Sequence, residues 1–413
     1  MFKCADIFII FCATFAVTCE SLQDKEIEIL NNILSSENYD SRIRPQSRND
    51  TLDDSTLVFV NMYVRSILQV DDVNMQYTVQ ITFRQQWFDE RLKYHNIENF
   101  PKYLTITKSG LLWAPDLFFS NEIDGHFHDI MTPNLYFRIY PDGSVIYSRR
   151  LTLRLGCPMN LKLYPLDRQV CTLRIASYAF TADDLNIMWR EYDPVGVVRN
   201  LQIQKFTFEK FFTDYCISKT PIGSYGCIKV DFLFKRNFLY YLLQMYVPGY
   251  MLVITSWLSF WFDASEANTR MILGVSTLFA LMMHTSFIGM SLPSVSYIKS
   301  IDVWTGVCLI FVFLALVEFV VVFCVSKSDL RKKILRINSN TSEKDVFLAQ
   351  LSDDLLGKDN IRMCSKVWIC SQWTKRFKTK AKCIDVVSRI FFPILFLLFN
   401  FVYWISYTVT ESE

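Results

Sequence analysis

The pattern of hydrophobic positions divides the chain into two parts. Between about residues 55 and 236, short runs rich in Val, Ile, Thr, Tyr and Phe recur between turn signals and partly alternate with polar residues. That alternation has the period of a half-buried β-strand. Asp142 and Gly143 supply the positive φ angles that a tight hairpin needs. The pattern predicts an all-β domain, and a β-sandwich is the simplest architecture for so many short strands.

Beyond this part the alternation stops and four long apolar runs follow. Each has 20 or more residues, about the number that a helix needs to cross the hydrocarbon core of a bilayer. The runs occupy residues 238–262, 271–290, 303–325 and 390–409. Buried helices of a soluble core are the alternative, but hydropathy disfavours it for four such runs. The pattern therefore predicts four transmembrane helices.

The N-terminus has the layout of a secretory signal peptide, which we assign to residues 1–20. Lys3 precedes a short apolar run that ends in small residues, although a buried helix is the alternative. Export would place the residues that follow in an oxidising compartment. Of the nine cysteines that follow the signal peptide, four precede the first long apolar run, an even number in a region expected to be exported. The sequon at Asn49 predicts glycosylation and agrees with export.

An exported N-terminus fixes the predicted topology. The segment 326–389 then lies in the cytoplasm, and its fifteen Lys and Arg against seven Asp and Glu agree with the positive charge of cytoplasmic loops. The predicted regions are a signal peptide, an extracellular β-sandwich, three helices, a cytoplasmic loop, and a fourth helix with an extracellular tail. Their bounds are 1–20, 21–236, 237–325, 326–389 and 390–413.

Composition disfavours several classes of protein. The chain has 43 basic and 41 acidic residues, so its small net charge indicates no nucleic-acid partner. It has four histidines, no phosphate-binding glycine loop, no ligand set with metal spacing and no nucleophile elbow. We therefore expect neither an enzyme nor a protein that holds a metal or another cofactor.

Two cysteines, Cys157 and Cys171, enclose thirteen residues around the apolar segment Tyr164-Pro165-Leu166. An exported β-sandwich with this ring, followed by three closely spaced helices, a loop and a fourth helix, resembles a subunit of the Cys-loop pentameric ligand-gated ion channels. The stretches TFRQQWFDERL, LLWAPDLFFSNE, ASYAF and DYCISKT look most like invertebrate glutamate-gated chloride channels. The resemblance implies a pentamer in the postsynaptic plasma membrane that conducts chloride when glutamate binds.

The resemblance also implies the agonist site. An amino-acid agonist needs guanidinium donors for its carboxylates and aromatic faces for its ammonium group. The expected residues are Arg65, Arg84 and Thr152, a hydroxyl donor, on one subunit face, and Ser177, Tyr178 and Tyr225 on the face of the neighbouring subunit. A disulfide between Cys216 and Cys227 would brace the loop that caps this site. Ile222 stands in that loop where the family carries a hydroxyl residue, which removes one polar contact.

The ring itself is expected to pass agonist binding to the pore. In the entropy model, a disulfide between Cys157 and Cys171 lowers the conformational entropy of the unfolded chain, which stabilises the fold by about 3 kcal/mol. By resemblance, its apolar tip presses on the link 292–299 that follows the second helix. The residues expected to couple the two domains are Tyr164, Pro165, Leu166, Lys235 and Arg236.

The second apolar run is expected to line the pore. Helical spacing of three to four residues puts an apolar stripe on one face, formed by Ile272, Ser276, Phe279, Met283 and either Ser286 or Phe287. Related channels carry Pro-Ala-Arg at the cytoplasmic entrance, whereas this chain has Asn268, Thr269 and Arg270. We expect Arg270 to line that entrance and to favour anions. Phe279 stands where relatives carry Leu, and five such rings would make a tight barrier.

Three hypotheses stay open at this stage. The first is a glutamate-gated chloride channel subunit, and the second is a channel with another amino acid or amine as agonist, or with altered ion selectivity. The third is a non-conducting subunit that modulates a hetero-pentamer. By resemblance, Gly306 would admit a macrocyclic lactone between helices of adjacent subunits. We interpret Glu318, inside the third helix, as a helix-packing contact.

Overall fold

The computed structural model describes residues 25–35, 38–46, 55–94, 101–338 and 380–412. These residues form two compact units. The first is Met1–Met159 with Arg168–Lys235, and the second is Asn160–Asp167 with Arg236–Glu413. The predicted signal peptide, the sequon at Asn49 and most of the predicted cytoplasmic segment lie outside the described residues.

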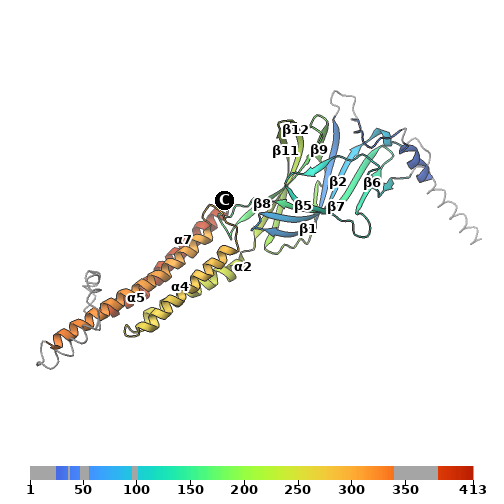
Figure 1. The fold of residues 1–413 in the computed structure, drawn as a ribbon. Helices are drawn as coiled ribbons and strands as arrows, with labels where there is room; N and C mark the ends of the chain where they lie inside the picture. Colours follow the sequence, from blue (N-terminus) through green and yellow to red (C-terminus); the bar gives the residue numbers. More distant parts are fainter. Residues whose placement is uncertain (1–24, 36–37, 47–54, 95–100, 339–379, 413) are drawn as a thin grey trace, which may run out of the picture. The chain divides into compact units, whose positions relative to one another are not determined.

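The first unit is a β-sandwich of two sheets (Figure 1). The larger sheet contains β1 (Thr56–Asp71), β2 (Gln76–Phe88), β3 (Leu104–Ile106), β5 (Glu122–Phe127), β6 (Leu135–Ile139), β7 (Ser144–Gly156), β9 (Leu185–Trp189) and β10 (Val195–Val197). The smaller sheet contains β4 (Leu117–Phe119), β8 (Arg168–Ser177), β11 (Phe206–Thr220) and β12 (Gly223–Arg236). The strand orders are β10-β1-β2-β7-β6-β3, with β5 on β7 and β9 on β1, and β11-β12-β8-β4. The predicted β-sandwich is confirmed.

The alternation in the sequence becomes an alternation of burial in the strands. In β1, Val58, Val60, Met62 and Val64 are buried, whereas the residues between them are exposed or half-buried. Successive side chains of a strand point to opposite faces, so the apolar half of this pattern forms the core between the sheets. The hairpin between β6 and β7 differs in one respect, because Gly143 has a φ of 86° but Asp142 does not have a positive φ.

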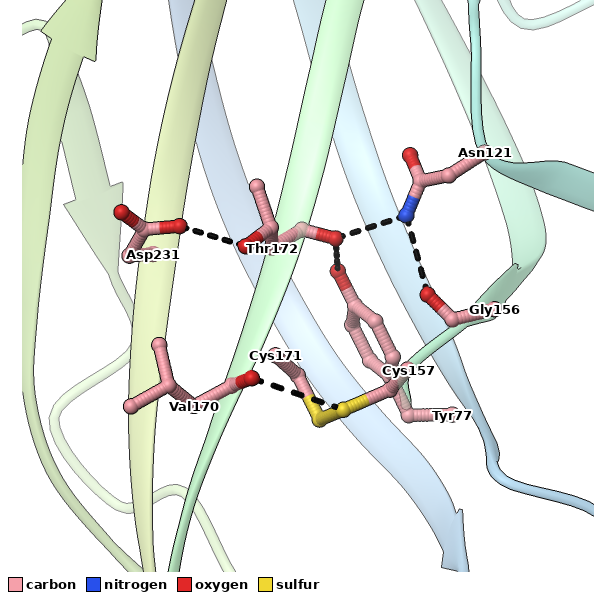
Figure 2. Close-up of a disulfide and its surroundings, with 8 residues drawn as sticks. All are labelled: Tyr77, Asn121, Gly156, Cys157, Val170, Cys171, Thr172 and Asp231. Carbon is pink, nitrogen blue, oxygen red and sulfur yellow. Dashed lines mark hydrogen bonds between the residues drawn. A yellow bond between two sulfur atoms is a disulfide. The ribbon is translucent and has the colours of Figure 1, made fainter. Parts of the chain in front are cut away.

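The disulfide between Cys157 and Cys171 joins the end of β7 to β8, and both cysteines are buried. Figure 2 shows the polar groups around it. The Asn121 side-chain amide donates to the carbonyl oxygens of Gly156 (3.0 Å) and Thr172 (2.7 Å), and the Tyr77 hydroxyl donates to the second of these (3.2 Å). The bridge therefore lies within a hydrogen-bonded joint between the two sheets.

The second unit contains four helical segments that are long and apolar enough to cross a membrane, among the residues described. The first is continuous but irregular, with α2 (Phe238–Tyr241), the π-helical turn η2 (Leu242–Tyr246), α3 (Val247–Trp257) and the 3₁₀ turn η3 (Leu258–Trp261). The others are α4 (Ala267–Met290), α5 (Ser300–Asn338) and α7 (Lys380–Ser412). The predicted four spans agree with these segments, and the chain is a multi-pass membrane protein.

The helices of this unit pack through close contacts and hydrogen bonds. Pro248 has no amide hydrogen and its ring would crowd the carbonyl group one turn earlier, which explains the wide turn η2 before it. A Cβ atom at Gly249 would lie 2.5 Å from the Trp304 ring, so only glycine allows this approach. The Tyr246 and Tyr403 hydroxyls lie 3.0 Å apart and join the first span to α7.

Two helices extend further than the apolar runs predicted. α5 continues to Asn338, beyond the expected boundary at 325, and α7 begins at Lys380, ahead of the expected 390. Lys, Arg and Leu are good helix formers, so a helix can continue where the apolar run ends. Hydropathy marks the length that can lie in a membrane and not the end of the helix.

Candidate functional site

The two arginines expected at the agonist site lie on neighbouring strands and share one face of the larger sheet. In the antiparallel pairing of β1 with β2, Asn61 lies opposite Arg84, and the side chain of Asn61 accepts a hydrogen bond of 3.1 Å from Arg84 Nη1. Arg65 lies at the β-bulge of β1, where its Nε donates to the Thr82 hydroxyl at 2.7 Å. Thr82 and Arg84 are two residues apart on β2, so they point to the same side.

A third arginine occupies the same face. Arg150 of β7 pairs with Thr82 in the strand register, and its Nη2 donates to Gln80 Oε1 at 2.9 Å. Arg65, Arg84 and Arg150 form no ion pair with any acid in the part of the chain that the structure describes. Three guanidinium groups without acids on one sheet face can bind a ligand that carries carboxylates.

The third residue of this predicted face, Thr152, contacts a histidine within the chain. It lies opposite Gln80 in the register of β2 and β7, and its hydroxyl lies 2.8 Å from His128 Nε2. Gln80 Nε2 lies 3.1 Å from the same nitrogen. Because Gln80 Oε1 accepts from Arg150, the amide nitrogen of Gln80 must donate to His128, and Nε2 of that ring is an acceptor.

It follows that His128 is neutral and that the Thr152 hydroxyl donates to it. Burial, together with the neighbouring Arg150 charge, lowers the pKa of His128. Within this chain the hydroxyl hydrogen of Thr152 goes to the imidazole, and its role at the agonist stays a prediction. Thr152 therefore presents acceptor lone pairs to anything bound on this face.

The other predicted agonist residues lie on the smaller sheet. The buried Ser177 hydroxyl donates to Asp116 Oδ1 at 2.8 Å, and Asp116 Oδ2 accepts from the Tyr178 amide at 3.1 Å. This carboxylate fixes the turn, so that the Tyr178 ring is exposed and contacts Phe118 edge to face at 5.6 Å. Ser177 therefore holds the turn, and Tyr178 presents an aromatic face.

The predicted capping loop lies at the same end of this sheet. β8 and β12 are antiparallel with Ala176 opposite Cys227, so Tyr178 and Tyr225 both lie two residues beyond that pair. The predicted bridge between Cys216 and Cys227 is present. It lines, with Tyr225, a pocket of about 340 Å³ between β9, β11 and β12. The arginine face and this end lie on different sheets.

The residues of the predicted coupling ring lie in the helical unit. Arg236 is 2% exposed, and its Nε and Nη2 donate to the two oxygens of Asp167 at 2.7 and 3.0 Å. The guanidinium lies 4.6 Å from the Tyr164 ring and donates to the Tyr241 hydroxyl at 3.0 Å. Pro165 is buried and Leu166 half-buried, whereas Lys235 belongs to the first unit.

The same ring contacts the link that follows α4. The Tyr297 hydroxyl accepts from the Leu161 amide at 2.9 Å, and the Ser300 amide donates to the Lys162 carbonyl oxygen at 2.9 Å. The Ser300 hydroxyl also donates to the Tyr164 carbonyl oxygen. The structure thus brings together the ring, the link and Arg236, the groups from which coupling was predicted.

α4 has two opposite stripes. The stripe predicted to face the pore, Ile272, Ser276, Phe279, Met283, Ser286 and Phe287, is exposed along its whole length. The opposite stripe packs inside the bundle and consists of Arg270, Gly274, Thr277, Leu281 and Ile288. Arg270 thus departs from its prediction, because its side chain is buried and paired with Asp385 of α7. Positions 270 and 272 differ by about 200° around a helix and so lie on opposite faces.

Two family models match the chain. The neurotransmitter-gated ion-channel ligand binding domain matches residues 26–238, and the neurotransmitter-gated ion-channel transmembrane region matches residues 245–359. The chain belongs to the neurotransmitter-gated ion-channel family. Members of this family are pentameric ligand-gated channels and not enzymes, as the sequence predicted.

Two relatives match this family member over almost their whole length. A glutamate-gated chloride channel of Drosophila melanogaster is 49% identical over 95% of this chain and 94% of its own. A glutamate-gated chloride channel subunit beta of Haemonchus contortus is 38% identical over 94% of this chain and 93% of its own. The resemblance inferred from the motifs is therefore confirmed.

Some residues of this channel subunit's site were missing from the sequence prediction. Gln80, His128 and Arg150 border Thr152 and the arginines, and Asp116 fixes Ser177. Gln80 lies four residues before Arg84 on β2, and Arg150 lies two residues before Thr152 on β7. Side chains at these spacings share a face of the sheet, so strand periodicity could have found both residues once the register was known. His128 directly follows β5, and nothing in the local sequence links it to Thr152.

Proposed function

We propose that this chain is a subunit of a glutamate-gated chloride channel that assembles as a pentamer in the plasma membrane, at synapses. The observation that carries the proposal is the set of arginines on the larger sheet, which have no acid partner among the described residues. Glutamate has two carboxylates, and Arg65 and Arg84 each retain guanidinium N–H groups for them. The names of the two relatives support the same agonist and ion.

The aromatic residues complete the proposed site. Tyr178 and Tyr225 lie at one end of the smaller sheet and would face the arginines of the next subunit, where their rings attract an ammonium group. Pentameric assembly would repeat this arrangement at each interface. Residues 326–389 would face the cytoplasm, and Asn49 would carry a glycan outside.

Voltage clamp of cells that express this subunit alone tests the proposal. We expect glutamate to evoke a current whose reversal follows the external chloride concentration. Arg84→Lys keeps the charge but loses the forked geometry, and it should weaken the glutamate response at least about tenfold. The control is Arg154→Lys, because Arg154 of β7 lies on the same face of the strand but already pairs with an acid, Asp124, at 3.1 Å. An agonist without a carboxylate would be little affected by Arg84→Lys.

A modulatory subunit is the second candidate function, and Phe279 favours it. Its side chain is 64% exposed on the predicted pore stripe, where five rings would make an apolar barrier. In that case the subunit would reach the cell surface but give no current when it is expressed alone. Expressed together with a related subunit, it would alter the currents of that subunit. Phe279→Leu should then give current to the subunit by itself.

A drug site near Gly306 belongs to the same proposal. A Cβ atom added at Gly306 would meet no heavy atom within 4 Å, so space is open beside this turn of α5. A macrocyclic lactone that enters there from between adjacent subunits should lose its effect when Gly306→Met fills the space. Gly289→Met is the matched control, because Gly289 is equally open but lies at the end of α4. An unchanged drug response in Gly306→Met would refute this site.

A further inference from the structure

A buried cluster of charges lies where the first turn of α4 meets α7. The Arg270 side chain, 1% exposed, binds Asp385 through two parallel hydrogen bonds of 2.9 Å, Nη1 to Oδ1 and Nη2 to Oδ2. Arg270 Nη2 also donates to the carbonyl oxygen of Phe262, the residue after η3. One side chain therefore joins the end of the first span, α4 and α7.

A second carboxylate shares this cluster. Glu318 of α5 is 9% exposed, and neither of its oxygens has a hydrogen-bond partner among the residues that the structure describes. It interacts electrostatically with both Asp385 and Arg270. Three helices thus contribute charged groups here, with one guanidinium for two acids.

The Arg270 pair constrains the rotation of α4 through its direction, which apolar contacts do not have. A planar guanidinium forms two bonds to a carboxylate only when the two groups are coplanar, so rotating α4 would break both bonds. Breaking a buried pair leaves an uncompensated charge in surroundings that solvate it poorly. Further along the stripe, Gly274 packs closely against α5, since a Cβ atom there would lie 2.6 Å from Leu316 Cδ1, and Thr277 bonds to carbonyl groups of its own helix. Neither contact requires a coplanar partner as the guanidinium does.

We propose that Asp385 is a positioning residue for the pore helix. Its pair with Arg270 fixes the rotation of α4 at the first turn and holds the guanidinium inside the bundle. The inference rests on the proposed function in one respect, because it takes the exposed stripe of α4 as the ion path. Arg270 then acts on permeation by setting the position of Ile272 and Ser276, and not as a charge that the ions meet.

The test measures which face of α4 is open to water, and it needs neither an agonist nor a current. A single cysteine replaces Ser276, on the exposed stripe, or its neighbour Thr277, on the buried stripe, in the full-length channel in lipid nanodiscs. Both variants react with a water-soluble methanethiosulfonate reagent. The parent protein is the blank, because Cys308, Cys324 and Cys383 are not in disulfides and could also react. We expect Ser276→Cys to react at least about tenfold faster than Thr277→Cys.

The ion pair is then broken in both cysteine variants. In Asp385→Asn, we expect the ratio of the two rates to fall below about threefold, because Arg270 loses the carboxylate that orients it and can turn, together with α4, toward Glu318. Exchanging the charges, with Arg270→Asp and Asp385→Arg together, restores the pair and should restore the ratio. Asp302→Asn is the matched control, because it removes an acid 3.5 Å from Lys299 in the same unit, and it should leave the ratio unchanged. An unchanged ratio in Asp385→Asn overturns the proposal.

Two further results keep the test decisive. If Asp385→Asn does not assemble, Arg270→Lys replaces it, since an ammonium group cannot make both parallel bonds, and an unchanged ratio there also overturns the proposal. In voltage clamp, the variant with exchanged charges should still give a current whose reversal potential follows chloride. A reversal potential that moves toward the equilibrium potential of the cations would mean that permeating ions meet the charge at position 270. If glutamate evokes no current but the labelling pattern holds, the proposed function fails and this inference stands.

Discussion

The helical unit contains two buried arginine–aspartate pairs, one at each end of the first span, and they differ in their surroundings. Arg236 and Asp167 lie beside the Tyr164 and Tyr241 rings, and the Tyr241 hydroxyl accepts a further bond from the guanidinium. Arg270 and Asp385 lie beside a second acid, Glu318, which accepts no hydrogen bond within the described part of the chain.

The difference separates two ways to bury an arginine. Hydroxyl groups can add to its carboxylate partner, or a second carboxylate can compete for it. At Arg236, the Asp167 carboxylate accepts from Nε and Nη2, and the neutral Tyr241 hydroxyl accepts from Nη1. At Arg270 two acids interact with one cation, and the cation can change partners. The Arg236 arrangement is suited to a fixed joint between segments of the chain. The Arg270 arrangement is suited to a helix whose position can change. Four substitutions test this contrast.

Asp167→Asn should have the largest effect. It removes the carboxylate that accepts two hydrogen bonds from the buried Arg236 guanidinium, and breaking a buried pair costs about 3–5 kcal/mol. We expect little channel at the cell surface and a lower melting temperature for what remains, measured by surface biotinylation and by size-exclusion after heating. Asp302→Asn, at an acid that is 45% exposed, is the control and should change the stability little. Normal surface levels of Asp167→Asn would contradict the fixed joint.

Asp385→Asn should cost less, about 1–3 kcal/mol, because Glu318 can take over Arg270. The double variant Asp385→Asn with Glu318→Gln removes both acids and should lose as much stability as Asp167→Asn. Melting temperatures of the two single variants and the double variant give the coupling energy. Additive losses would show that Glu318 is not an alternative partner.

Tyr241→Phe removes only the hydroxyl that accepts from Arg236. A hydrogen bond to a charged group contributes about 1.5–3 kcal/mol, so we expect a moderate loss of stability with the ring packing retained. The melting temperature of the solubilised channel measures it. Tyr240→Phe is the matched control, because the adjacent Tyr240 side chain is exposed. Equal effects of the two substitutions would exclude a specific role for the Tyr241 hydroxyl.

Glu318→Gln should have the smallest effect, and its sign is informative. The carboxylate is buried without a hydrogen bond in the described structure, so replacing it with a neutral amide relieves a desolvation cost. We expect a stability within about 1 kcal/mol of the parent, on the stabilising side. A clear loss in melting temperature would mean that Glu318 already holds Arg270 in the parent channel.

Much of the fold follows from the sequence because two simple constraints act locally. Alternation in β1 requires one apolar face, and runs of 20 or more apolar residues require a membrane or an equivalent core. Helix ends were less predictable, since α5 and α7 continue past their apolar runs. The π-helical turn η2 follows from Pro248, but the sequence alone does not distinguish it from a kink.

The site was predictable where the family resemblance fixes a position, and less so where distant segments meet. Arg65 and Arg84 lie on one sheet face as expected, and both expected disulfides are present. The role of Arg270 depends on Asp385, which is 115 positions away in the sequence. Helical periodicity alone, however, separates Arg270 from the face of Ile272, so part of that difference was available from the sequence.

The assignment of Asn160–Asp167 to the helical unit has a consequence for making the ligand-binding part as a separate reagent. A secreted protein that ended at Lys235 would keep both disulfides but would expose the Tyr164 ring and leave the Asp167 carboxylate without its arginine. Such a surface promotes aggregation. Replacing Tyr164, Pro165 and Leu166 with polar residues should yield a soluble protein for screening compounds without a membrane.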